Sequence, residues 1–207
     1  MGNKIIVVGI SGASGAAYSV RLIECLAEAG AEIHLVVSPY GRQLLSDELD
    51  IKRLDPVALT AGRPDLLTVY SYQDVGARIA SGSFLTDGMV LCPCSSNTLG
   101  AIASGLGGNL LHRAAAVTLK ESRRLILVPR EMPLSIIEIE GMLTISRAGG
   151  IICPAAPGFY LRPQRVEDLV DFVVGKILDL LGIEHALHTR WEGGIGSADP
   201  PPGATQP

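Results

Sequence analysis

Polar and charged side chains gather directly after several apolar segments of this sequence, and their types suit the binding of an anion. The run Cys92-Pro93-Cys94-Ser95-Ser96-Asn97-Thr98 places four polar residues before a predicted helix of small side chains at 101–104. A helix N-cap needs one such residue. The surplus therefore indicates a nest of hydroxyl and N–H groups for an anion or for the polar edge of a ligand.

A second candidate is Ser11-Gly12-Ala13-Ser14-Gly15, which opens a predicted helix at 16–29. Its small residues let a ligand approach the backbone, the helix start offers free N–H groups, and the hydroxyls of Ser11 and Ser14 add donors. The glycine order matches neither the G-x-G-x-x-G of dinucleotide enzymes nor the G-x-S-x-G of a nucleophile elbow. An ordinary N-cap remains the alternative for this loop, and also for Ser38.

Arg130 and Glu131 stand between two prolines and offer phosphate binding and proton transfer. A guanidinium can fork onto a phosphate, and a carboxyl group can carry a proton to or from a reacting atom. The alternative is a surface ion pair, which contributes little. Tyr160 ends another rigid turn, and Arg113 and Lys120 lie on nearly one face of a predicted helix, where alone they would be a solvated basic face.

Distant loops need a scaffold that brings them together, and the sequence pattern predicts one. Apolar β-branched segments predict strands, and amphipathic segments predict helices. The predicted strands are 4–10, 32–38, 88–92, 125–128 and 151–153, and the predicted helices are 16–29, one from 39, 111–121, 135–147 and 166–181. This alternation indicates an α/β fold with a three-layer doubly wound parallel sheet of Rossmann or flavodoxin type. Ligands bind such sheets beyond the carboxyl ends of the strands, where the candidate residues stand.

Several boundaries of the fold are also predicted. Ser135 followed by Glu138 indicates a capping box, and segments 53–64 and 71–86 are expected to be rich in loops. The chain is expected to form one domain over 1–191 and a disordered Gly/Pro-rich tail over 192–207. The inner face of the helix at 166–181 is predicted to be Val166, Leu169, Val170, Val173, Ile177 and Leu180.

Composition excludes several classes of function. Apolar residues make up 47% of the 207 residues, which suffices for a sizeable core, and the net charge of -4 argues against nucleic acid as a partner. No apolar run approaches the roughly 20 residues that span a bilayer, and the N-terminus lacks a signal-peptide pattern, so we expect a cytoplasmic protein. The cysteine and histidine spacings predict no metal site. We expect reduced, mostly buried thiols, with a catalytic thiol at Cys92 or Cys94 as the alternative.

Together, the segments after the strands offer two candidate anion sites, several hydroxyl groups and the Arg130-Glu131 pair, and the predicted helix at 111–121 adds the cations Arg113 and Lys120. This set predicts a phosphorylated planar cofactor and a second anion, without specifying the cofactor. The sequence resembles the UbiX family of flavin prenyltransferases, within the wider group of homo-oligomeric flavin-containing cysteine-decarboxylase-like folds. The matching motifs, over about 4–191, are Ser-Gly-Ala-Ser-Gly at 11–15, Cys-Pro-Cys-Ser at 92–95, Arg-Ala-Ala at 113–115, Leu-Lys-Glu at 119–121, Leu-Val-Pro-Arg-Glu-Met-Pro-Leu-Ser at 127–135, Pro-Ala-Ala-Pro-Gly-Phe-Tyr at 154–160 and Val-Glu-Asp-Leu-Val-Asp-Phe at 166–172.

The resemblance implies FMN as cofactor and dimethylallyl phosphate as second substrate, with the prenyl group joined to N5 and C6 of reduced FMN. It implies a homo-oligomer, a dodecamer, whose product prenylated FMN serves a UbiD-type decarboxylase, including one of ubiquinone synthesis. It implies that FMN is held by Gly12, Ala13, Ser14, Ser38, Ser95, Ser96, Asn97, Thr98 and Arg130. It implies that the prenyl phosphate is held by Arg113, Lys120, Glu131, Tyr160, Lys176 and, from a neighbouring subunit, Glu48.

The catalytic roles implied by the resemblance fall on three residues. Glu131 would protonate the leaving phosphate and then accept the proton released at C6. Ser14 would steady N5 by a hydrogen bond, and Lys120 would help to neutralise the departing phosphate without a metal. Many relatives carry Arg at the position of Lys176 and Trp at that of Val75, so donor preference is left open.

Two other functions remain open on the sequence. The first is an FMN-dependent decarboxylase of cysteine-ended substrates with the same fold, which the motif at 130–135 disfavours. The second is a non-catalytic flavin carrier, which needs the FMN nests but not Glu131, Lys120 or Arg113.

Overall fold

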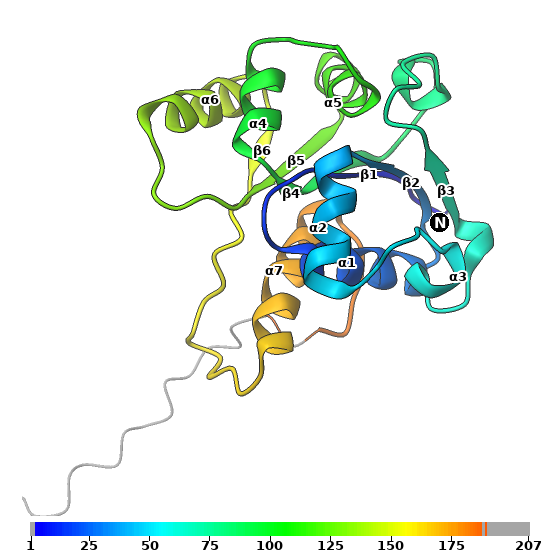
Figure 1. Cartoon of the computed structure of the whole chain (residues 1–207), viewed down its shortest axis with the longest axis vertical. Coiled ribbons are helices and arrows are strands. Elements are labelled where there is room, and N and C mark those ends of the chain that lie inside the picture. Colours follow the sequence, from blue (N-terminus) through cyan, green and yellow to red (C-terminus); the bar gives the residue numbers. More distant parts are fainter. Residues whose placement is uncertain (1–2, 188, 190–207) are drawn as a thin grey trace, which may run out of the picture.

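A six-stranded parallel sheet forms the centre of the protein, and the computed structural model describes residues 3–187 and 189 (Figure 1). The strands are β1 (Ile5–Ile10), β2 (Glu32–Val37), β3 (Leu67–Tyr70), β4 (Gly88–Cys94), β5 (Arg124–Pro129) and β6 (Ile151–Ile152). Their spatial order is β3-β2-β1-β4-β5-β6, and each neighbouring pair is parallel. The order therefore reverses between β1 and β4, whose carboxyl ends form the switch point where ligands bind in such folds.

Helices connect the strands and cover both faces of the sheet (Figure 1). They are α1 (Ala16–Glu28), α2 (Pro39–Leu49), α3 (Pro56–Leu59), α4 (Ser96–Ala103), α5 (Leu110–Lys120), α6 (Ile136–Arg147) and α7 (Val166–Leu181). In the part of the chain that the structure describes, no helix has the length and apolar character needed to span a bilayer. The predicted doubly wound α/β fold is confirmed, and the predicted tail at 192–207 lies outside the described residues.

The alternation of strand side chains divides the core into two layers. Ile6 and Val8 of β1 belong to the cluster that includes Ile23 of α1 and Ile177 of α7, whereas Val7 belongs to the cluster formed with α4, α5 and α6. Figure 1 accordingly shows α1 and α7 on one face of the sheet and α4, α5 and α6 on the other. The strands carry apolar residues on both faces because both faces are covered.

Two elements differ from the sequence-based predictions. The edge strand β3 lies where we predicted no strand, and β4 continues past Cys92 to Cys94. β3 has only four residues and follows a turn that begins at Pro64, so its local signal is short. Its formation depends on pairing with β2, from Ile33 opposite Leu67 to Val36 opposite Tyr70, which is tertiary information.

The ends of the helices follow local sequence signals with one exception. The capping box of α6 is confirmed, with Ser135 and Glu138 satisfying each other's backbone N–H groups. The predicted inner face of α7 is wrong at its start, because Val166 is 70% exposed. The first turn of α7 projects beyond the sheet (Figure 1), so Val166 has no core to pack against. Val173 and Ile177, further along the helix, are buried as predicted.

Candidate active site

Ser11 fastens the loop after β1 to the loop after β4. Its hydroxyl donates to the carbonyl of Pro93 at 3.0 Å and accepts from the backbone N–H of Ser95 at 2.8 Å. Its own N–H also donates to the Pro93 carbonyl, at 3.2 Å, and the residue is 1% exposed. The Ser11 hydroxyl therefore serves the fold, which corrects our expectation that it would donate to a ligand. The bridge holds the two switch-point loops in register.

Replacing Ser11 with Ala is expected to lower the free energy of unfolding by about 2 kcal/mol, because two hydrogen bonds are lost and a backbone N–H is left unpaired. Urea denaturation of the two proteins measures the difference. Ser83→Ala, on an exposed loop, is the matched control and is expected to change stability little. An unchanged denaturation midpoint for Ser11→Ala would contradict the assigned bridge.

Glu48 of α2 occupies the start of α1. Its carboxylate accepts from the N–H groups of Gly15 at 3.0 Å and Ala16 at 2.8 Å, and it also bonds to the hydroxyl of Ser14. Within the chain, the start of α1 is therefore already occupied by a carboxylate, so it is not the open anion nest that the sequence predicted. The contact of Glu48 with the site of a neighbouring subunit stays a prediction.

The charge of Glu48 is stabilised at this position. Partial burial opposes ionisation, but the hydrogen bonds from Ser14, Ala16 and Gly15 and the positive charge of Arg130 outweigh it, so the pKa of Glu48 lies below its ordinary value of 4.5. Glu48 is therefore a carboxylate at neutral pH, aligned on the Ser14 hydroxyl.

The pKa of Glu48 predicts a pH dependence of stability. A carboxyl group whose pKa is lowered by folding contributes stability above its unfolded pKa, and this contribution is lost as pH falls through the folded pKa. The free energy of unfolding is therefore expected to fall more steeply between neutral pH and about pH 3 in the native protein than in Glu48→Gln, because an amide does not titrate. Urea denaturation across this range tests it, and identical pH profiles would contradict it.

Arg130 and Glu131 follow β5 and contact different loops. The Arg130 Nε donates to the carbonyl of Ser14 at 3.2 Å. The Glu131 carboxylate accepts from the Ser96 hydroxyl at 3.2 Å and from the N–H of Met132 at 3.3 Å. The segment after β5 is thus joined on one side to the loop after β1 and on the other to the start of α4.

The starts of α2 and α4 complete this edge of the sheet. Ser95 caps α4, where its hydroxyl also donates to the Thr98 Oγ1 at 3.1 Å, and Ser38 caps α2 through the Gly41 N–H at 3.0 Å. Asn97 is exposed and Ala13 is buried. Gly12 lies against α2 so closely that an added Cβ would be 2.5 Å from the Cβ of Tyr40. Only a glycine fits between these two segments.

Comparison with known proteins identifies the family. Residues 1–178 match the Flavoprotein family. Flavin prenyltransferase UbiX of Halalkalibacterium halodurans is 48% identical over 191 residues, which cover 90% of this chain and 93% of the relative. The chain belongs to the UbiX family of flavin prenyltransferases. This confirms the resemblance stated from the motifs.

Solved structures agree with the membership in the UbiX family. AnUbiX (PadA1) in complex with FMN and dimethylallyl pyrophosphate has a TM-score of 0.86 and 40% identity, covering 93% of this chain and 100% of that chain. A dodecameric FMN-dependent UbiX-like decarboxylase from Escherichia coli O157:H7 has a TM-score of 0.84 and 43% identity, covering 91% of this chain and 100% of that chain. The flavin prenyltransferase reading is thereby favoured over the two alternatives left open by the sequence.

Lys120 lies away from the convergent loops of this UbiX-family chain. It ends α5, four residues before Arg124, which pairs with the first residue of β4 at the amino edge of the sheet. There its Nζ is 3.6 Å from a carboxylate oxygen of Glu121. Arg113 is also exposed on α5. It lies seven residues before Lys120, which is about 10 Å along the helix axis. Lys120 therefore cannot serve the loops at the carboxyl edge of its own chain.

Tyr160 lies in the segment between β6 and α7, and Lys176 lies on α7. The ring of Tyr160 packs edge-on against Phe172, with centroids 5.5 Å apart. Burial raises the pKa of the Cys153 thiol, and the positive charge of Lys176 opposes this increase. Among the predicted site residues, direct contacts join Ser14 with Glu48 and Arg130, and likewise Ser96 with Glu131.

The cysteines of this UbiX-family chain are free thiols, as predicted. Cys25, Cys92 and Cys94 are buried and Cys153 is partly buried. Burial raises the pKa of Cys92, and it raises that of Cys94 to about 12. Both thiols therefore stay protonated at neutral pH and are poor nucleophiles.

Proposed function

We propose that this chain transfers a dimethylallyl group from dimethylallyl phosphate to N5 and C6 of reduced FMN, and that the prenylated FMN serves a UbiD-type decarboxylase. The observation that supports this most is that the segment after β5 contacts both loops of the switch point in a UbiX-family fold, Arg130 through Ser14 and Glu131 through Ser96. These polar groups, which we call the flavin seat, and the Glu131 carboxyl group therefore lie at the edge of the sheet where ligands bind in such folds.

The residues at the switch point fit FMN. Gly12 packs closely against α2 and has no side chain, so a ligand in the flavin seat can approach its backbone. The start of α4, with Ser95, Ser96, Asn97 and Thr98, offers N–H groups and hydroxyls to a phosphate or a polar edge. When bound, reduced FMN supplies the nucleophilic N5 and C6 atoms. Arg130 is positioned to hold its polar edge, and Ser38 and Ala13 to border it.

Glu131 is assigned the proton transfers. Ser96 and the Met132 N–H hold its carboxylate at the mouth of the site. From there the acid form could protonate the phosphate that departs as the bond to N5 forms. Closure onto C6 would then need a proton on the double bond left in the prenyl chain, and the carboxylate could accept the proton released at C6. Ser14, which bonds to the Glu48 carboxylate, can donate or accept at N5. Tyr160 and Lys176 are proposed to contact the phosphate of the donor.

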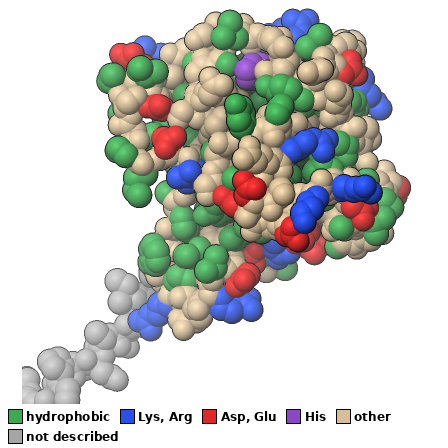
Figure 2. All heavy atoms as spheres, viewed as in Figure 1, with side chains coloured by type: hydrophobic (Ala, Val, Ile, Leu, Met, Phe, Trp, Pro, Cys, Tyr) green, Lys and Arg blue, Asp and Glu red, His purple; other side chains and the backbone are tan. Residues whose placement is uncertain are grey.

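A second copy of the chain is proposed to complete the site with Lys120 and Arg113. Because Lys120 lies at the opposite edge of its own sheet, it can bind a donor phosphate only in another copy. An exposed apolar surface favours such assembly, and Figure 2 shows hydrophobic side chains gathered over the α6 side of the molecule. These exposed residues are Met132, Leu134, Ile136, Ile137, Ile139 and Leu143. An assembly of twelve chains is supported by the dodecameric Escherichia coli relative.

The experiment is anaerobic incubation of the full chain with reduced FMN and dimethylallyl monophosphate, followed by mass spectrometry of the extracted flavin. We expect a mass gain of one prenyl unit that depends on the protein and on the donor. Release of carbon dioxide from a cysteine-ended peptide, with unmodified flavin, would favour the decarboxylase. Tight FMN binding with neither product would favour the carrier.

A further inference from the structure

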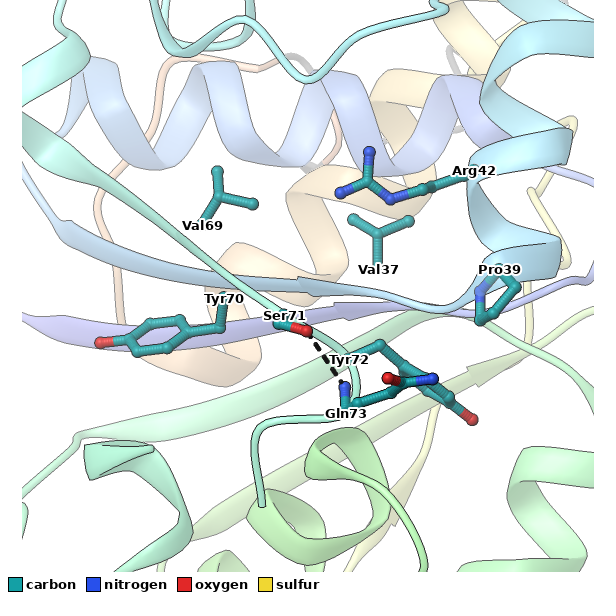
Figure 3. Close-up of a pocket in the computed structure, with 8 residues that line it drawn as sticks. All are labelled: Val37, Pro39, Arg42, Val69, Tyr70, Ser71, Tyr72 and Gln73. Atoms are coloured by element: carbon teal, nitrogen blue, oxygen red, sulfur yellow. Dashed lines mark hydrogen bonds between the residues drawn. The ribbon is translucent and has the colours of Figure 1, made fainter. Parts of the chain in front are cut away.

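A pocket of about 430 Å3 lies beyond the carboxyl ends of β2 and β3 (Figure 3). Val37, Pro39 and Val69 give it apolar groups, and Arg42, Ser71 and Gln73 give it polar groups. Figure 3 shows Val37, Val69 and Arg42 pointing to the same side of the two strands. The pocket adjoins Ser38, the cap of α2, so it borders the proposed flavin seat on the side away from β4.

The guanidinium of Arg42 is available for an anion. The ion pairs of the described residues use other cations, and none involves Arg42. Neither Arg130 nor the start of α1 lines this pocket, and within the described part of the chain Arg42 is its only lining residue with a positive charge. An anion that enters the pocket therefore meets Arg42, which can fork onto a phosphate.

The rim of the pocket is held in place before a ligand arrives. The Tyr72 carbonyl accepts from the N–H of Leu110 at 2.9 Å, which ties the end of β3 to α5. The Ser71 hydroxyl accepts from the N–H of Gln73 at 3.4 Å (Figure 3), and the Tyr70 hydroxyl lies 3.0 Å from the His34 Nδ1. A fixed rim lowers the entropy lost when a small molecule binds.

We propose that this pocket binds an adenosine 5′-phosphate group. Its apolar groups suit a flat ring, while the hydroxyl of Ser71 and the amide of Gln73 offer donors and acceptors to the edge of a purine. Arg42 takes the phosphate. The group can come from free AMP or from the AMP half of FAD, and only the FAD source rests on the proposed flavin seat.

Calorimetric titration of the full chain with AMP, adenosine and inorganic phosphate tests the proposal. AMP is expected to bind at least about tenfold more tightly than adenosine, and Arg42→Gln is expected to abolish this difference while leaving adenosine binding unchanged. Arg147→Gln, an exposed arginine at the end of α6, is the matched control and should retain the difference. Ser71→Phe, which fills the pocket from an exposed position, is expected to abolish binding of both ligands.

The source of the group is distinguished by repeating the AMP titration with FMN-saturated protein and by competing FAD against FMN. If FMN leaves the affinity for AMP unchanged and FAD binds more weakly than FMN, the ligand is free AMP. If FAD binds more tightly than FMN and displaces AMP, the ligand is the AMP half of FAD. The proposal is overturned if AMP does not bind, if phosphate alone binds as well as AMP, or if Arg42→Gln leaves the preference for AMP over adenosine intact. Prenyl transfer to FMN, measured separately, is unaffected by any of these outcomes.

Discussion

Replacing Glu131 with Gln is expected to lower the rate of prenyl transfer by about 10²- to 10⁴-fold while FMN still binds. An amide has nearly the shape of the carboxylate, so the contacts with Ser96 and the Met132 N–H can persist in part. It can neither give a proton to the departing phosphate nor accept one from C6. Single-turnover formation of prenylated flavin, quantified by mass spectrometry, measures the rate, and quenching of flavin fluorescence measures FMN affinity.

The control for this change is Glu140→Gln, which alters an exposed carboxylate on α6. It is expected to leave both the rate and the FMN affinity unchanged. If Glu131→Gln kept the native rate, the proton-transfer role would be wrong. If it lost FMN as well as activity, Glu131 would instead be part of the flavin seat.

Replacing Lys120 with Met is expected to lower prenyl transfer by about 10²- to 10³-fold, because a cation facing the departing phosphate is lost. Mixing these chains with Glu131→Gln chains, after dissociation and reassembly, is expected to restore activity. A site formed from two copies needs a native Glu131 in one and a native Lys120 in the other, so about a quarter of the sites in an equal random mixture should be intact.

Two results of the mixing experiment would contradict a site formed from two copies of the chain. Absence of restored activity in reassembled mixtures would show that both residues act within one chain, contrary to the position of Lys120 at the amino edge of its sheet. Full activity of the Lys120→Met chains alone would remove that lysine from the site. Lys52→Met, an exposed lysine near the end of α2, serves as the charge control.

Much of the fold could be predicted because its signals are local. Apolar β-branched segments indicated five of the strands. Hydroxyl residues after two of them marked the helix starts that Ser38 and Ser95 cap, and the Ser135–Glu138 spacing marked the start of α6. β3 was missed because its four residues depend on pairing with β2 for their structure. Propensity alone does not contain that pairing.

The site was predictable in its location but less so in its contacts. Parallel strands bring their carboxyl ends to one edge, so the meeting of Ser14 with Arg130 followed from the order of segments. The contact of Glu48 with Gly15 spans 33 residues and carries no sequence signal. Arg42 was missed for a similar reason, since its significance depends on the edge strand β3 that forms the opposite wall of its pocket.

The central claim is that the chain joins a prenyl group to both N5 and C6 of reduced FMN. Reduced FMN that carries deuterium at C6 tests this most directly, because ring closure at C6 must release that deuterium. After anaerobic incubation with the protein and dimethylallyl monophosphate, we predict an extracted flavin that has gained one prenyl unit and lost the label. Recovery of FMN with its deuterium and its original mass would contradict the account.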